Sequence, residues 1–217
     1  MSRRQSPEAA ATLVGELNAL DIGTHTALEF DAQDPQSVAR LIDLAFDRYG
    51  RVDVLVNNVG PWGGESIRDV SLTEWRTVLE GNLTAAWMAS RSALKYMDRS
   101  GWGRVINISA GSAYVRNHST YGLAKAALIT LTEELAAAVS EGITVNCVAP
   151  GQIAESVPEL GELGPEIVDR IIEATPTKRL VTRQEVADVV AVLCSDGFAS
   201  LNGVTLPLDG GWRLNRF

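Results

Sequence analysis

A tyrosine and a lysine stand four positions apart in a segment that has the pattern of a strand followed by a helix. Residues 105–108 (VINI) are mostly apolar and β-branched, which is typical of a buried parallel strand. Ser109 and Ser112 follow this run, and a helix then carries Tyr121 and Lys125. Side chains four positions apart share one face of a helix. The sequence therefore predicts a phenol beside an ammonium, just beyond the carboxyl end of a strand, where ligands bind in open α/β sheets.

These two groups suit proton exchange with an oxygen atom. A free tyrosine has a pKa of about 10, and a nearby cation favours the phenolate and lowers that pKa. A phenol tuned in this way can donate a proton to a carbonyl oxygen or accept one from an alcohol. A serine hydroxyl at the adjacent strand end would hold the same oxygen. Because Tyr and Lys also occur at this spacing by chance, an ordinary helix surface is the alternative interpretation.

The rest of the chain alternates between helical and strand patterns, which predicts a parallel sheet with helices on both faces. We expect one domain over residues 1–217. Expected strands cover residues 24–30, 51–56, 104–109, 143–149 and 204–208, and expected helices cover residues 7–20, 35–46, 71–97, 121–140, 166–173 and 182–194. Capping boxes at Ser71-x-x-Glu74 and Thr182-x-x-Glu185 mark two of the helix starts.

Composition narrows the class of protein. The net charge of −8 argues against nucleic acid or an anionic membrane as a partner. Cys147 and Cys194 are expected to be buried thiols without metal-ligand spacing, which fits a reducing cytoplasm and predicts no metal site. The first residues lack the apolar core of a signal peptide, and no run is long and apolar enough to span a bilayer. We therefore expect a cytoplasmic protein.

Five motifs in order make the chain resemble the short-chain dehydrogenases/reductases, and in particular the 3-oxoacyl-[acyl-carrier-protein] reductases. They are a strand-end Ser followed by Tyr-x-x-x-Lys, Asn57-Asn58-Val59-Gly60, Asn82 in GNLTAAW, Pro150-Gly151, and Leu208-Asp209-Gly210-Gly211-Trp212. The resemblance implies a Rossmann-like three-layer αβα fold with a mostly parallel sheet. It also implies NAD(P)-dependent reduction of a ketone, or oxidation of a secondary alcohol, by hydride transfer.

The resemblance also implies roles for site residues. Tyr121 would be the acid/base, Lys125 would lower its pKa and hold the cofactor ribose, and Asn82 would support a proton relay. The substrate oxygen would be oriented by a serine, for which Ser109 is the first choice and Ser112 the second, because Ala110 occupies the commonest serine position. A strand-end cap is the alternative for either serine.

Cofactor-binding positions follow from the same resemblance. They are Arg4, Asp31, Ala32, Asn58, Gly60, Tyr121, Lys125, Pro150, Gly151 and Ile153. Arg4 would bind the 2′-phosphate of NADP, with a solvated terminus as the alternative, and Asp31 could equally be a turn residue. Glu155 stands where the family often has Thr, and a carboxylate near phosphates is unfavourable.

The glycine-rich β-α-β unit with which family members begin has no counterpart in the sequence. Its glycines let the backbone approach the cofactor pyrophosphate at a helix N-terminus. Without its central strand, the strand at residues 52–57 would have an unpaired edge. We expect one of three outcomes. Residues 24–30 pair with this edge, the domain is unstable, or a partner chain occupies the place of the missing strand. A start codon inside a longer gene and a genuinely shortened protein are both explanations.

Two functions therefore stand as hypotheses. The first is an NADP-dependent ketone reductase or alcohol dehydrogenase acting on a small molecule, with cofactor binding weakened or lost. The alternative is a cofactor-free, non-redox binding or assembly protein on the same scaffold. The helix from Thr73 and the helix with Tyr121 resemble those that form the family's four-helix dimer interface, so we expect a homodimer or homotetramer.

Overall fold

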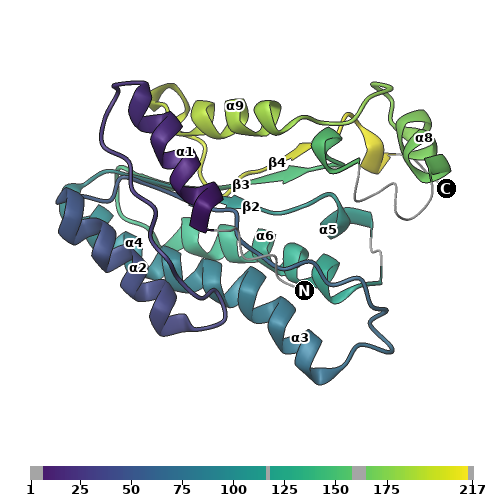
Figure 1. The fold of residues 1–217 in the computed structure, drawn as a ribbon, viewed down its shortest axis with the longest axis horizontal. Coiled ribbons are helices and arrows are strands. Elements are labelled where there is room, and N and C mark those ends of the chain that lie inside the picture. Colours follow the sequence, from purple (N-terminus) through teal and green to yellow (C-terminus); the bar gives the residue numbers. More distant parts are fainter. Residues whose placement is uncertain (1–6, 116–117, 158–164, 215–217) are drawn as a thin grey trace.

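A four-stranded parallel sheet lies between two layers of helices in the computed structural model, which describes residues 7–115, 118–157 and 165–214 (Figure 1). The strands are β1 (Val54–Asn57), β2 (Gly103–Ile108), β3 (Ile143–Pro150) and β4 (Thr205–Leu208), and they lie in that order across the sheet. Every residue of β2 and β3 is buried, whereas β1 alternates between exposed and partly buried residues. The expected three-layer α/β fold is confirmed.

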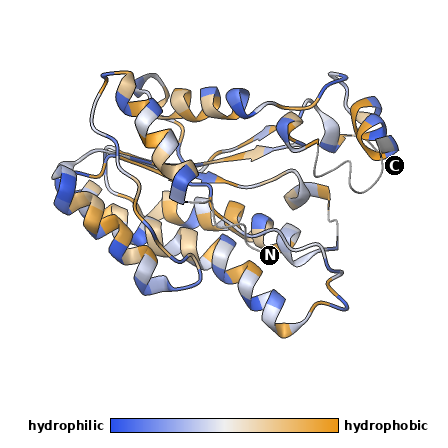
Figure 2. Cartoon of the chain, viewed as in Figure 1, coloured by the Kyte–Doolittle hydropathy of each residue, from blue (hydrophilic) through white to orange (hydrophobic). Residues whose placement is uncertain are grey.

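Helices cover both faces of the sheet. The helices α2 (Pro35–Tyr49), α4 (Ala85–Ser100) and α6 (Thr120–Ala138) lie on one face, and α9 (Arg183–Leu193) lies on the other (Figure 1). Successive strand residues point to opposite faces, so Val105 packs against Met97 of α4, whereas Ile106 packs against Leu193 of α9. Most helices carry both hydrophilic and hydrophobic residues (Figure 2), as one-sided packing requires.

The shorter elements connect these layers. The described residues also form α1 (Pro7–Ala19), α3 (Leu72–Leu79), α5 (Ser112–Val115) and α8 (Pro165–Ala174). A π-helical stretch at Glu80–Thr84 joins α3 to α4, and 3-10 turns lie at Ala154–Ser156, Asp196–Phe198 and Trp212–Leu214. Among the residues that the structure describes, no helix is long and apolar enough to cross a membrane.

Local capping signals predicted helix starts correctly. The Ser71 hydroxyl accepts a hydrogen bond from the backbone N–H of Glu74 at 3.1 Å. Thr182 and Glu185 form both halves of a capping box at the start of α9. The single helix predicted from Ser71 to about Met97 is wrong, however, because the π-helical stretch divides it.

The predicted strand at residues 24–30 is not formed, because within the described part of the chain this segment pairs with no strand. In the described part of the chain β1 pairs with β2 alone, and Val54 and Val56 on β1 are 42% and 41% exposed. A β-branched pattern predicts an extended backbone, but a strand also needs a neighbour for its N–H and C=O groups. The expectation that residues 24–30 would pair with this edge is therefore wrong.

Burial of side chains is not fully predicted by the sequence pattern. Helical spacing places Ala10, Leu13, Val14 and Leu17 on one face of α1, but this helix has no buried residue, and Leu13 is 54% exposed. Cys147 is buried as predicted, whereas Cys194 is only partly buried. Amphipathic spacing identifies a helix face that can be buried, but the tertiary structure decides whether another element covers it.

Candidate active site

Backbone hydrogen bonds connect the carboxyl ends of β2, β3 and β4. The backbone N–H of Gly111, just after β2, donates to the carbonyl of Pro150 at the end of β3 at 2.6 Å. The N–H of Gly151 donates to the carbonyl of Leu208 at the end of β4 at 2.8 Å. A Cβ atom at Gly151 would lie 3.0 Å from the backbone of Asp209, which is tighter than an ordinary van der Waals contact. Pro150 and Gly151 therefore join the strand ends at which the candidate site lies.

Tyr121 and Lys125 lie together on α6, as their spacing predicts. The helix begins after Ser119, whose hydroxyl accepts from the N–H of Gly122 at 3.0 Å. The ammonium of Lys125 lies 5.5 Å from the centre of the Tyr121 ring, and Lys125 is only 4% exposed. The helix therefore holds a phenol and an ammonium side by side and largely away from water.

Reciprocal hydrogen bonds join this part of α6 to the end of β2. The ammonium of Lys125 donates to the carbonyl of Ile108 at 2.8 Å. In return the hydroxyl of Ser109 donates to the carbonyl of Lys125 at 2.7 Å. Both side chains are buried. The pair of bonds fixes the lysine relative to the strand.

Burial controls the pKa values of both groups. It raises the pKa of Tyr121 to about 12 and lowers the pKa of Lys125 to about 8, because each charged form is poorly solvated. The expected lowering of the phenol pKa by the ammonium is therefore wrong for the free chain. The ammonium is bound to the carbonyl of Ile108 and lies over the Tyr121 ring. At neutral pH Tyr121 keeps its proton.

Asn82 lies in the π-helical stretch and is 1% exposed. Its amide nitrogen donates to the carbonyls of Pro61 at 2.8 Å and Val78 at 3.0 Å. Its amide oxygen is buried without a hydrogen-bond partner in the described structure. A Cβ atom at Gly60 would lie 2.0 Å from that oxygen. Gly60, in the loop after Asn58, is thus directly beside Asn82, and π-helical turns often occur at functional sites.

A chain of side-chain hydrogen bonds that we did not predict connects Asn57, Asn107 and Thr132. The amide nitrogen of Asn57 on β1 donates to the side-chain oxygen of Asn107 on β2 at 2.8 Å. The amide nitrogen of Asn107 donates to the hydroxyl of Thr132 on α6 at 2.9 Å. Because these partners are 50 and 25 positions apart, no local sequence signal identifies this chain of hydrogen bonds. It ties the end of β1 to the helix that carries Tyr121.

Two of the predicted cofactor-binding residues, Asp31 and Ala32, have local contacts outside this group of residues. The Asp31 carboxylate accepts from the N–H of Gln33 at 2.9 Å, as an ordinary turn residue would. Ala32 packs against the hydrophobic cluster that contains Val38. Arg4 lies outside the described residues. Ile153 forms a parallel β-bridge with Val181, so it is held beside the segment that leads into α9.

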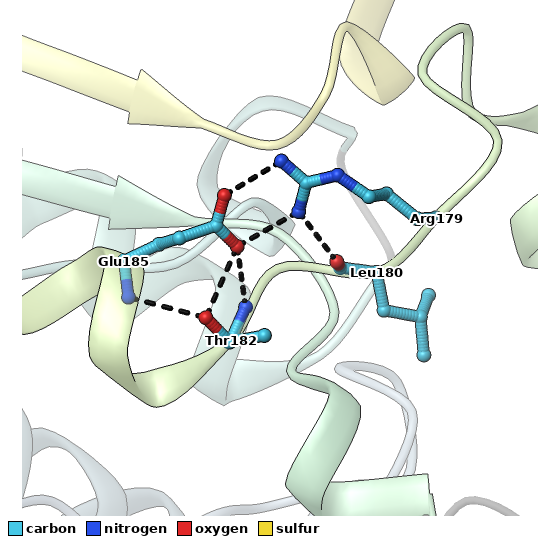
Figure 3. A network of polar contacts seen from close by, with 4 residues as sticks. All are labelled: Arg179, Leu180, Thr182 and Glu185. Carbon is cyan, nitrogen blue, oxygen red and sulfur yellow. Dashed lines mark hydrogen bonds and ion pairs between the residues drawn. The ribbon is translucent and has the colours of Figure 1, made fainter.

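Glu155 has a structural partner that the sequence did not reveal. Its carboxylate oxygens accept from the backbone N–H of Arg183 at 3.1 and 3.2 Å, at the N-terminus of α9. Figure 3 shows the adjacent network in which Arg179, Thr182 and Glu185 close the same helix end. A helix N-terminus stabilises a carboxylate. Glu155 is therefore a helix cap, which weakens the expectation that its charge opposes a cofactor.

The C-terminal motif is a turn built around a buried acid. Asp209 is 7% exposed. Its carboxylate accepts hydrogen bonds from the backbone N–H groups of Gly211 at 2.9 Å and Arg213 at 3.0 Å. In the described part of the chain, no group of three His, Cys, Asp or Glu residues is arranged to hold a metal ion.

The fold and the site define a class of protein: a Rossmann-like α/β domain with a tyrosine–lysine pair beyond the carboxyl ends of its parallel strands. Residues 4–213 match a family model described as enoyl-(acyl carrier protein) reductase. The chain belongs to this family, the short-chain dehydrogenases/reductases.

Known relatives match nearly the whole chain. It is 30% identical over 220 residues to a D-beta-hydroxybutyrate dehydrogenase of Rhizobium meliloti, which covers 95% of this chain and 85% of that protein. It is 33% identical over 211 residues to a 3-oxoacyl-[acyl-carrier-protein] reductase of Synechocystis, covering 95% and 83%. A gluconate 5-dehydrogenase from Burkholderia cenocepacia, solved with NADP and tartrate, superposes with a TM-score of 0.89 at 25% identity, covering 97% and 84%.

Proposed function

We propose that this protein is an NADP(H)-dependent oxidoreductase that reduces a small ketone or oxidises a secondary alcohol. The observation that carries the proposal is the pair of the partly buried Tyr121 and the buried Lys125 at the strand ends. The names of the relatives, which include hydroxy-acid dehydrogenases and oxoacyl reductases, support the same class of reaction.

Tyr121 acts as the proton donor in the direction of reduction. Its pKa of about 12 keeps the phenol protonated at neutral pH, so it can donate to a carbonyl oxygen as negative charge develops there. Lys125, with a pKa of about 8, is largely an ammonium at pH 7 and stabilises the phenolate that remains. NADPH, when bound, supplies the hydride that the carbonyl carbon accepts, so the products are a secondary alcohol and NADP⁺.

The residues present fit one part of this cofactor better than the other. Tyr121, Lys125 and Asn58 offer polar groups to the nicotinamide ribose, and the buried amide oxygen of Asn82 lacks a partner in the described structure. The sequence contains no glycine-rich turn to receive the pyrophosphate. Hydrogen bonds to charged groups contribute about 1.5–3 kcal/mol each. Without two or three of them, affinity falls by about a hundredfold or more.

Calorimetric titration of NADPH into the chain tests this expectation. We expect weak binding, and recovery when a glycine-rich β-α-β unit is added at the amino end. A dissociation constant in the low micromolar range for the chain alone would contradict the reasoning. If neither form binds NADPH, the cofactor-free binding or assembly protein becomes the better proposal. The observation that favours it is the outer edge of β1, which pairs with no strand among the described residues.

Turnover tests the reaction itself. NADPH oxidation is followed with a panel of substrates: keto acids whose reduction gives hydroxy acids, 3-oxoacyl thioesters and one enoyl thioester. Tyr121→Phe removes one hydroxyl and keeps the ring, so we expect ketone reduction to fall by about a hundredfold or more. Activity of Tyr121→Phe within tenfold of the parent would contradict the assignment of the acid.

We also propose that the protein forms a homodimer through α4 and α6. A hollow of about 520 Å³ on this side is lined largely by apolar groups, among them Leu83, Trp87, Ala127 and Leu131, and Trp87 is 41% exposed. An exposed apolar patch of this kind marks an interface. Light scattering should give a dimer or tetramer for the parent and a monomer for Trp87→Glu.

A further inference from the structure

Two serines near the end of β2 have different surroundings. Ser109 is 3% exposed, its backbone N–H donates to the carbonyl of Val148 at 2.8 Å, and its hydroxyl donates to the carbonyl of Lys125 at 2.7 Å. The hydroxyl of Ser112 is buried and has no hydrogen-bond partner in the described part of the chain.

The direction of the strand explains where Ser109 points. Residues two apart in a strand point to the same face. Asn107 contacts Thr132 of α6, and Ser109, two positions later, therefore meets Lys125 on the same helix. The ammonium of Lys125 returns a bond to Ile108 at 2.8 Å. The hydroxyl proton of Ser109 is thus engaged in the hydrogen bond to the carbonyl of Lys125. Donating this proton to a substrate would break that hydrogen bond.

The hydroxyl of Ser112 makes no such hydrogen bond within the described part of the chain. It begins α5, which packs against α6, the helix that carries Tyr121. Figure 1 shows α5 near the end of the sheet where β2 finishes. The preceding residue, Gly111, is bonded to Pro150 and holds this turn against the strand ends. Native proteins rarely leave a buried hydroxyl unpaired, so an unpaired one suggests a missing ligand or water.

Building on the proposed function, we propose that the two serines have separate tasks. Ser112 supplies the hydroxyl that binds the carbonyl or alcohol oxygen of the substrate beside Tyr121. Ser109 is a positioning residue, which fixes Lys125 through its backbone carbonyl. The chain thereby retains a substrate-binding hydroxyl although Ala110 occupies the commonest position of the serine in its family.

Paired alanine variants distinguish the two tasks. We expect Ser112→Ala to lower kcat for ketone reduction by about a hundredfold, as loss of a donor to a developing oxyanion does. Its urea unfolding midpoint should not fall, because the hydroxyl has no partner to lose. Ser109→Ala should instead lower the unfolding midpoint and reduce kcat less.

Lysine-selective NMR reads the positioning role directly. Lys95 and Lys178 are the other lysines of the chain, so the Lys125 signal is readily assigned. Ser109→Ala should loosen the buried lysine and move its titration midpoint upward, toward the ordinary value. Ser112→Ala should leave that midpoint unchanged, and Ser109→Thr, which keeps a hydroxyl, should restore it.

Each outcome decides something. A parent that turns over ketones while Ser112→Ala stays within threefold of its kcat overturns the assignment of Ser112. A Ser109→Ala variant with unchanged unfolding and unchanged Lys125 titration overturns the positioning role. If neither the chain nor its form with an added glycine-rich β-α-β unit turns over ketones under saturating NADPH, the proposed function is contradicted and with it the task of Ser112. The unfolding and NMR measurements still decide the task of Ser109.

Discussion

Replacing Gly60 by alanine should disturb the site through Asn82. The added Cβ atom would lie 2.0 Å from the amide oxygen and 2.6 Å from the amide carbon of Asn82. Because Asn82 is 1% exposed and packed on all sides, its side chain cannot move without losing contacts. We expect it to give up its hydrogen bonds to Pro61 and Val78.

The size of the effect follows from these contacts. Two buried hydrogen bonds contribute about 0.5–1.5 kcal/mol each, and forcing a methyl group into a packed interior costs about 1–3 kcal/mol. The free energy of unfolding of Gly60→Ala should therefore be lower by about 2–6 kcal/mol. That is a large fraction of the total stability of a typical domain, which is about 5–15 kcal/mol.

Urea unfolding measures this difference against a matched control. Gly15→Ala makes the same chemical change within α1, where a Cβ atom would meet nothing within 4 Å. It should raise stability by up to about 1 kcal/mol, because alanine is the better helix former. The double variant Gly60→Ala/Asn82→Ala lacks the amide with which the new Cβ atom collides. Its loss of unfolding free energy should therefore be smaller than the sum of the losses of the two single variants. Equal stability of Gly60→Ala and the parent, or strictly additive losses, would refute the reasoning.

Three further predictions concern pH and backbone geometry. Burial lowers the pKa of Lys125 from 10.5 to about 8, so between pH 8 and 10.5 the unfolded chain binds more protons than the folded chain. The stability of the parent relative to Lys125→Met, measured by urea unfolding, should therefore rise with pH over this interval. Arg179 and the capping contacts lower the pKa of Glu185 from 4.5 to about 2, so the thermal midpoint advantage of the parent over Glu185→Gln should be complete above pH 4.5 and disappear as pH falls toward 2. Gly142→Ala should unfold at lower urea concentration than the parent, because Gly142 has a φ of +84° and its Cβ would lie 2.2 Å from the carbonyl oxygen of Gly101; an unchanged midpoint would count against that explanation.

Sequence alone determined the features that depend on neighbours along the chain. The capping residues Ser71 and Thr182 start their helices because a side chain bonds a backbone group only three positions away. Tyr121 and Lys125 share a face because helical geometry is regular. The order of strands and helices, and with it the three-layer fold, followed from hydrophobic periods that each segment carries by itself.

The tertiary structure decided everything that depends on distant partners. Residues 24–30 have a strand pattern but no neighbouring strand, and a continuous helical pattern did not reveal the π-helical stretch at Asn82, whose side chain bonds Pro61. The phenol pKa of Tyr121 rises because burial disfavours the charged phenolate. Ser109 is engaged by Lys125, 16 positions away, while Ser112 is left unpaired in the described structure. Solvation and hydrogen-bond competition depend on every group that surrounds a side chain, and a sequence pattern records only the nearest of them.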